Sequence, residues 1–168
     1  MQRLNSTPRF FHFAIKRRAY FPNSVLPVLL YKKVFQLPKQ KNKAAEIIRQ
    51  IFSAHQWSNS WKNGIYDFHH YHSTTHECLG VAMGSATIIL GGPGGKRKIL
   101  EQGDLLIIPA GVGHKCVSHS ADFFCVGAYP KGKEYDINKG TVEEYKKALP
   151  LLKKIPFGKE NNLSVYWK

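Results

Sequence analysis

A close succession of short apolar segments separated by glycine-containing turns limits what this 168-residue chain can fold into. Regular alternation of short strands and turns is typical of antiparallel sandwiches and barrels. The fold class we predict is therefore mainly β, with a few peripheral helices. The predicted strands of this region are residues 66–72, 78–83, 86–90, 97–100, 105–108, 114–118 and 123–129.

Helical spacing of apolar residues appears on both sides of this region. It predicts one helix from about residue 43 to 55, with one apolar face and one polar face. A second helix begins at a capping box formed by Thr141 and Glu144, and Pro150 is expected to interrupt it. The helices therefore lie outside the predicted β region and are expected to pack against it.

Two further strands are predicted before the first helix, at residues 10–15 and 28–35, from their aromatic and β-branched content. Trp57 and Trp61 flank a Ser-Asn-Ser turn, and we expect both indoles to pack the first helix against the sheet. The last dozen residues, 157–168, are expected to return to the sheet or to form an interface.

The chain is strongly basic, with 25 Lys and Arg against 11 Asp and Glu, a formal net charge of +14. This charge favours encounter with anionic partners. The basic residues are scattered in pairs along the sequence, a pattern typical of a solvated surface, so we consider a nucleic-acid partner unlikely. No apolar run approaches the roughly 20 residues that span a bilayer, so no membrane association is predicted.

Three cysteines without a C-x-x-C pair argue against a disulfide framework and for a reducing compartment. The first 45 residues carry no Asp or Glu and superficially resemble a transit peptide, but no apolar secretory segment follows them. We therefore predict a cytoplasmic location.

Four of the eight histidines crowd into residues 64–84. His70 and His72 are two residues apart, so in an extended chain both imidazoles project from the same face, and Glu77 follows across a short turn. A second glycine-bounded run contains His114, which would complete a set of three nitrogens and one oxygen if the two runs pack together. The pattern is a metal-site hypothesis.

These two runs resemble the two motifs of the cupin superfamily. The first motif is matched at Gly64, His70, His72, Glu77 and Gly84. The second is matched at Gly103, Pro109, Gly111 and His114. Ser118 stands where the familiar motif ends in asparagine, a departure expected to affect hydrogen bonding around the site more than metal ligation. From about residue 10 onward the chain is also similar to the single-domain YjlB-like cupins, a group without an assigned reaction. The segments that carry this similarity are 21–24, 26–31, 70–74, 109–111 and 127–130.

The resemblance implies a double-stranded β-helix, the jelly-roll barrel of cupins, with His70, His72, Glu77 and His114 converging inside one end of it. Such a ligand set suits one divalent transition metal, Fe, Mn, Ni or Zn, and leaves positions open for a substrate. The expected organisation is a single cupin domain over residues 1–168. Within it we expect a flexible basic tail at 1–9, a barrel core at 64–130 that carries both motifs, and a helical extension at 141–155.

Residues next to the expected ligands are further candidates. His69 and His76 neighbour ligands in sequence, so strand alternation turns them to the opposite face, although His76 could act as a base beside the site if its turn is not extended. Cys116 shares the inward face of His114, as a core thiol or as a sulfur near the metal. Tyr66 and Phe68, on the face of His70, are candidate pocket walls.

Two functions stay open at this point. The first is a mononuclear metal-dependent enzyme of oxygenase, isomerase or decarboxylase type that acts on a small polar or anionic molecule. The second is a small-molecule binding or sensor protein without turnover, because a cupin can keep its motif and yet not catalyse a reaction. We also expect a homo-oligomer, most simply a dimer.

Overall fold

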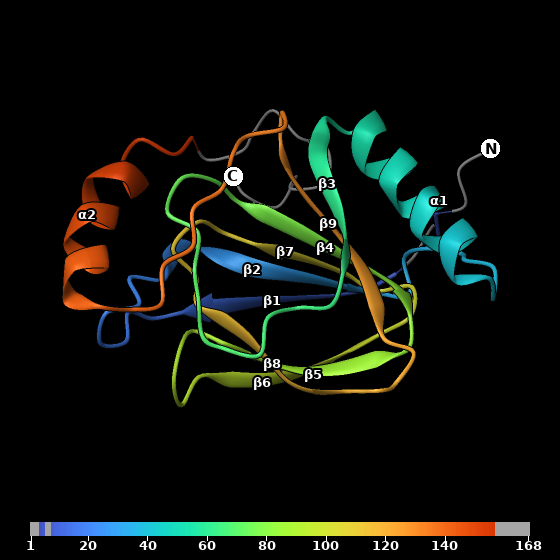
Figure 1. Cartoon of the computed structure of the whole chain (residues 1–168), viewed down its shortest axis with the longest axis horizontal. Helices are drawn as coiled ribbons and strands as arrows, with labels where there is room; N and C mark the ends of the chain where they lie inside the picture. The colour runs from blue at the N-terminus through green and yellow to red at the C-terminus, as the bar shows by residue number, and fades with distance from the viewer. Residues whose placement is uncertain (1–3, 6–7, 157–168) are drawn as a thin grey trace.

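Two antiparallel sheets enclose the centre of the molecule in the computed structural model, which describes residues 4–5 and 8–156 (Figure 1). The larger sheet has the order β1-β2-β7-β4-β9-β3 and the smaller sheet the order β6-β5-β8. In the larger sheet the strands are β1 (Arg9–Ile15), β2 (Ser24–Lys32), β7 (Leu105–Ile108), β4 (Glu77–Met83), β9 (Phe124–Pro130) and β3 (Trp57–Asn63). In the smaller sheet they are β6 (Lys96–Glu101), β5 (Ser85–Leu90) and β8 (His114–His119). Two helices lie outside the sheets, α1 (Lys41–Ala54) and α2 (Val142–Leu152).

The strand order is that of a jelly roll, because strands far apart in sequence are neighbours in the sheet. β2 pairs with β7, and β4 lies between β7 and β9, all of them antiparallel. The prediction of a mainly β jelly-roll barrel with a few peripheral helices is confirmed.

Two predictions about the backbone between α1 and β4 were wrong. Residues 66–72 do not form a strand, because His70 and Tyr71 make single β-bridges to different partners, His114 and Asn138, and so never extend into a ladder. The expected turn between Trp57 and Trp61 lies inside edge strand β3, whose register shifts between Ser58 and Trp61. Exposed polar residues in the middle of this strand hid it from an apolar pattern.

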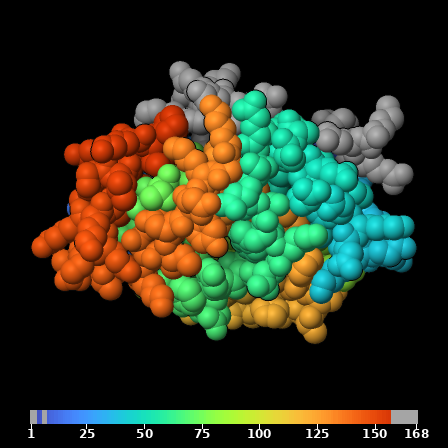
Figure 2. All heavy atoms as spheres, turned by 45° about the horizontal axis from the view of Figure 1, so that its top comes forward, coloured from blue at the N-terminus to red at the C-terminus, as the bar shows by residue number. Residues whose placement is uncertain are grey.

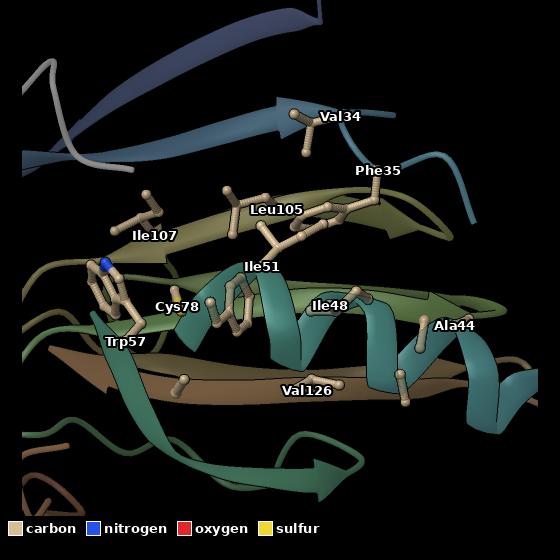
Figure 3. Packing of buried hydrophobic residues seen from close by; sticks show 14 of the residues in the cluster. Val34, Phe35, Ala44, Ile48, Ile51, Trp57, Cys78, Leu105, Ile107 and Val126 are labelled. Atoms are coloured by element: carbon tan, nitrogen blue, oxygen red, sulfur yellow. The ribbon is translucent and has the colours of Figure 1, made fainter. Parts of the chain in front are cut away.

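The larger sheet is covered on both faces. α1 packs across its outer face, against β3, β4 and β9, and turns Ile48 and Ile51 toward the strands (Figure 3). The inner face packs against the smaller sheet, where Leu79 and Leu106 join a second apolar cluster that includes Ile88. Burial on both faces explains why every residue of β7 is buried and why neither β7 nor β4 shows a polar alternation.

Gly80 of β4 marks the closest approach of α1 to the sheet. A Cβ atom there would lie 2.6 Å from Cγ2 of Ile48 and 3.1 Å from Cζ of Phe52. We expect Gly80→Ala to lower the free energy of unfolding by about 1–3 kcal/mol, the usual effect of overpacking a core. Urea denaturation of this variant against Gly64→Ala, where a Cβ meets nothing within 4 Å, is the measurement. Equal stability of the two variants would contradict the expectation.

α2 begins as predicted, at a capping box in which the Thr141 hydroxyl accepts from Glu144 N and the Glu144 side chain accepts from Thr141 N. The helix then runs past Pro150 to Leu152 instead of stopping there. Pro150 removes one backbone hydrogen bond, and only Leu151 and Leu152 follow it in the helix.

The predicted terminal segments fall largely outside the described residues. This is true of residues 157–168 and of most of the expected basic tail, within which Leu4 makes a β-bridge to Phe35. In the part of the chain that the structure describes, neither helix is long and apolar enough to cross a membrane.

Candidate metal centre

Three buried histidines meet at one end of the barrel. Ligating atoms of His70, His72 and His114 all lie within 4.8 Å of one another. The pairing of two segments brings them together: His70 N donates to His114 O at 3.1 Å and His114 N donates to His70 O at 2.8 Å. The two histidine-bearing runs of the sequence therefore pack directly against each other, as the metal-site hypothesis required.

Each of the three imidazoles is anchored through Nδ1 to a main-chain carbonyl. The acceptors are Phe68 O for His70, Asp136 O for His72 and Val112 O for His114. Because a carbonyl oxygen can only accept, each Nδ1 carries a proton, so in the neutral imidazole the lone pair is on Nε2. This arrangement is what metal-binding histidines need from their surroundings, so the three side chains could hold a metal ion.

Glu77 adds a carboxylate beside two of the histidines. Its Oε2 lies 3.2 Å from Nε2 of His114 and 3.5 Å from Nε2 of His72. Burial alone would raise the pKa of Glu77, but His72 and His114 outweigh it and hold this pKa below its usual range. Glu77 is therefore an anion at neutral pH, in the state in which a carboxylate binds a cation.

The pKa values of two of the histidines move in opposite directions. Burial, with the neighbouring His114, lowers the pKa of His70 to about 3, so His70 is neutral across the physiological range. Burial also acts to lower the pKa of His72, but the Glu77 carboxylate raises it above its usual value. A metal cation bound among these side chains would balance the negative charge of Glu77 in place of a proton on His72.

The cluster forms one end of a cavity of about 190 Å³. Its walls are mainly aromatic and apolar, and they include Trp61, Ile65, Tyr66, Tyr129 and Tyr135. Tyr135 stacks on Tyr129, with ring centroids 4.6 Å apart, and presents its edge to His72. A polar, potentially metal-bearing end and apolar walls are the usual composition of a small-molecule site.

Comparison with known proteins agrees with this geometry. A family model described as a cupin domain matches residues 61–127, which contain His70, His72, Glu77 and His114. The uncharacterized protein YjlB of Bacillus subtilis (strain 168) is 43% identical over 107 residues, 64% of this chain and 65% of that protein. Residues 61–127 of this chain are therefore similar to a cupin domain, and the chain is similar to YjlB. The match covers less than two thirds of the Bacillus protein.

The solved structures found by comparison have much lower sequence identity to this chain. Acireductone dioxygenase from Bacillus anthracis, with a cadmium ion in its active centre, is 17% identical, with a TM-score of 0.43 over 64% of this chain and 80% of that one. The TDP-fucose-3,4-ketoisomerase WlaRA from Campylobacter jejuni is also 17% identical, with a TM-score of 0.41 over 94% of this chain and 97% of that one.

Of the residues predicted to lie beside the ligands, Tyr66 lines the cavity. Its ring and that of His70 are in a T-shaped arrangement, with centroids 5.2 Å apart. Phe68 stacks on Tyr66 behind the cavity wall. Cys116 is buried in the apolar cluster between the sheets, as a core thiol would be. Strand alternation predicts that Cys116 lies on the inner face of β8, as it does. At this position the inner face packs in the apolar core.

His76 lies away from the histidine cluster. Its Nδ1 accepts from Ala110 N at 2.9 Å and its Nε2 donates to Pro156 O at 3.0 Å. Burial lowers the pKa of His76 to about 4, so it is neutral and bonded to main chain on both sides. These contacts fit a structural residue and give no support to a base beside the site. His69 is likewise outside the cluster, where it meets the edge of Phe21.

Sequence reasoning missed the segment that follows β9. The Asp136 carboxylate accepts hydrogen bonds from Ser73 N, Ser73 Oγ, Thr74 N and Thr74 Oγ1, and from Asn138 Nδ2. These bonds and that of His72 to Asp136 O join residues 72–74 to residues 134–138. Figure 2 shows the two segments side by side, green against orange. An aspartate sixty-four residues beyond His72 carries no spacing signal that could have identified it.

We expect Asp136→Ala to loosen this junction. The variant loses the five hydrogen bonds that the carboxylate accepts. It keeps the main-chain oxygen of residue 136 that accepts from His72, but the position of this oxygen then depends on the loop alone. Amide hydrogen exchange should accelerate across residues 72–75, and metal affinity should fall about 10–100-fold, as for other residues that orient ligands. Asp122→Ala, on an exposed turn, is the matched control. Unchanged exchange at residues 72–75 would contradict the assigned role.

Proposed function

We propose that this protein is a mononuclear metal-binding cupin in which His70, His72, His114 and Glu77 hold one divalent transition ion, Fe, Mn, Ni or Zn. The observation that carries the proposal is the shared orientation of the three imidazoles. Each imidazole donates its Nδ1 proton to a main-chain carbonyl, so Nε2 is the nitrogen that could bind a metal, and ligating atoms of the three rings lie within 4.8 Å of one another. Glu77 supplies the one negative charge among these four side chains.

The protein would bind a small polar or anionic molecule at this centre. A divalent ion beside one carboxylate leaves a net positive charge in a buried cavity, which favours an anionic group. When bound, the ion would polarise a carbonyl, carboxylate or enolate oxygen, or bind dioxygen. The cavity is smaller than the roughly 300–1,000 Å³ typical of drug-sized ligands, so its walls admit only a small molecule.

The residues of this chain would orient that molecule and keep water away from it. Tyr66 and Tyr135 lie on the cavity wall, where their rings can pack against a planar or apolar part of the ligand. Tyr135 is held by stacking on Tyr129. The reaction would be of oxygenase, isomerase or decarboxylase type, the three classes that metal polarisation of a small oxygen-rich substrate can serve.

Metal analysis of the purified protein tests the proposal. We expect one transition ion per chain after gentle purification, or after reconstitution of the metal-free protein with Fe²⁺, Mn²⁺, Ni²⁺ or Zn²⁺ in turn. Incubation of each loaded form with a panel of small keto and hydroxy acids, with and without dioxygen, then tests turnover. A protein that neither contains nor takes up any of the four ions would overturn the proposal.

A binding or sensor protein without turnover is the second candidate. It is favoured by the composition of the cavity, since among its described lining residues the groups beyond the four proposed ligands are mainly aromatic and apolar. Burial and the Glu77 charge raise the pKa of Tyr129 above its usual value, so this phenol stays protonated and is not available as a base. Saturable binding of a small acid to the metal-loaded protein, without conversion across the panel, would favour this function.

A cytoplasmic location and a homodimer belong to the same proposal. Cys78, Cys116 and Cys125 are buried free thiols, as a reducing compartment would allow. Sedimentation equilibrium tests the dimer directly, because a monomer at micromolar concentration would contradict it.

A further inference from the structure

Two consecutive hydrogen bonds connect Trp61 through Tyr129 to Glu77, one of the proposed metal ligands, and are called the relay below. The indole Nε1 of Trp61 donates to the Tyr129 hydroxyl at 2.8 Å, and the Tyr129 hydroxyl donates to Oε1 of Glu77 at 2.9 Å. The direction is fixed, because an indole nitrogen can only donate and an ionised carboxylate can only accept. The phenol is therefore an acceptor toward Trp61 and a donor toward Glu77.

This relay engages one oxygen of Glu77 and leaves the other. Oε1 is bonded to Tyr129, whereas Oε2 faces the Nε2 atoms of His72 and His114 at 3.5 and 3.2 Å. Tyr129 and Glu77 are both almost fully buried, so water does not compete well for either oxygen. The two oxygens of the carboxylate are thus chemically different before any metal binds.

The relay is built into the sheet by three adjacent strands. Glu77 lies on β4, Tyr129 on β9 and Trp61 on β3, which are neighbours in the larger sheet. Trp61 pairs with Gly127, two residues before Tyr129 and hence on the same face of β9. A Cβ atom at Gly127 would lie 2.2 Å from the Trp61 ring. The glycine therefore lets the indole lie across β9 and reach the phenol.

We propose that Trp61 and Tyr129 are positioning residues that restrict Glu77 to binding the metal through Oε2 alone. This inference rests on the proposed metal site. Restricting Glu77 to one oxygen preserves a coordination position that a bidentate carboxylate would fill, and that position is available to the small anionic ligand. The relay therefore supports both the affinity for the metal and the vacancy that the ligand needs.

Titration of the metal-free protein with Co²⁺, monitored by calorimetry and visible absorption, tests the inference together with crystal structures of the loaded forms. In the wild-type protein we expect one Glu77 oxygen in the coordination sphere. Tyr129→Phe should raise the Co²⁺ dissociation constant about 10–100-fold, the usual effect of removing an outer partner of a ligand. It should also allow Glu77 to bind through both oxygens, with a changed visible spectrum. Tyr20→Phe, which removes a hydroxyl from an exposed tyrosine outside the cavity lining, should leave affinity and spectrum unchanged.

The possible outcomes separate this inference from the proposed function. No Co²⁺ binding by the wild-type protein would overturn both. Wild-type binding with a bidentate Glu77, or with Tyr129→Phe equal to wild type in affinity and spectrum, would overturn the relay alone. If Tyr129→Phe does not fold, Trp61→Phe decides. It keeps Tyr129 but frees its hydroxyl from the indole, so it should weaken Co²⁺ binding, and unchanged binding would overturn the inference.

Discussion

Replacing His72 with alanine is expected to abolish tight metal binding while the protein stays folded. His72 is 4% exposed, its Nε2 lies among the other proposed ligands, and its Nδ1 is bonded to Asp136 O. Since residues that merely orient a ligand already contribute 10–100-fold, loss of the ligand itself should weaken binding by more than about 100-fold. Calorimetric titration with Zn²⁺ and circular dichroism of the same samples are the measurements.

A matched control for this variant is available on β8. His119 is an exposed histidine in the same strand as His114, and His119→Ala should bind Zn²⁺ as the wild type does. If His72→Ala unfolds, the volume-conserving His72→Gln separates loss of packing from loss of ligation. Wild-type affinity in a folded His72→Ala protein would remove His72 from the site. Global unfolding of both variants would mark the site as structural and not catalytic.

Replacing Asp104 with alanine is expected to be the most damaging single change away from the metal centre. The Asp104 side chain is fully buried and accepts from Lys32 Nζ, Lys33 N and Glu101 N. These bonds fasten the turn before β7 to the end of β2. Loss of one partner of a buried, hydrogen-bonded ion pair usually costs about 3–5 kcal/mol, so a comparable fall in the free energy of unfolding is predicted.

Urea denaturation of Asp104→Ala should be compared with that of Glu101→Ala. Glu101 also pairs with Lys32, at 3.0 Å, but its side chain is 47% exposed, and an exposed ion pair contributes no more than about 1 kcal/mol. We expect Asp104→Ala to lower the free energy of unfolding much more than Glu101→Ala does, although both carboxylates pair with Lys32. Equal stabilities would show that burial of Asp104 does not control its contribution.

The histidine cluster could be predicted from the sequence because its members are at fixed spacings. His70 and His72 converge with His114 as expected from their two-residue separation and from the pairing of the two glycine-bounded runs. This held even though residues 66–72 form no strand, since an extended backbone alternates its side chains whether or not it joins a ladder. Whether Glu77 joins the three histidines on a metal stays a prediction.

The surroundings of the cluster could not be predicted in the same way. Trp61 was expected to pack the first helix against the sheet, but its indole lies in the cavity wall and donates to Tyr129. A register shift in β3 separates its environment from that of Trp57. Asp136 is joined to His72 by tertiary contact alone. Alternation also predicts only which face a side chain takes, so it could not tell that Cys116 packs in the core and that His76 bonds to main chain.

The use of carbonyl acceptors for all three imidazoles has a consequence for how this protein can change. A carbonyl is present whatever the residue, so no substitution at Phe68, Val112 or Asp136 deletes an acceptor outright. The tautomers of the histidines are therefore robust to point mutation and depend only on the path of the backbone. Insertions and deletions in the loops that carry these three carbonyls are the changes that could retune the centre, and those loops are where variation with altered metal preference should be sought or engineered.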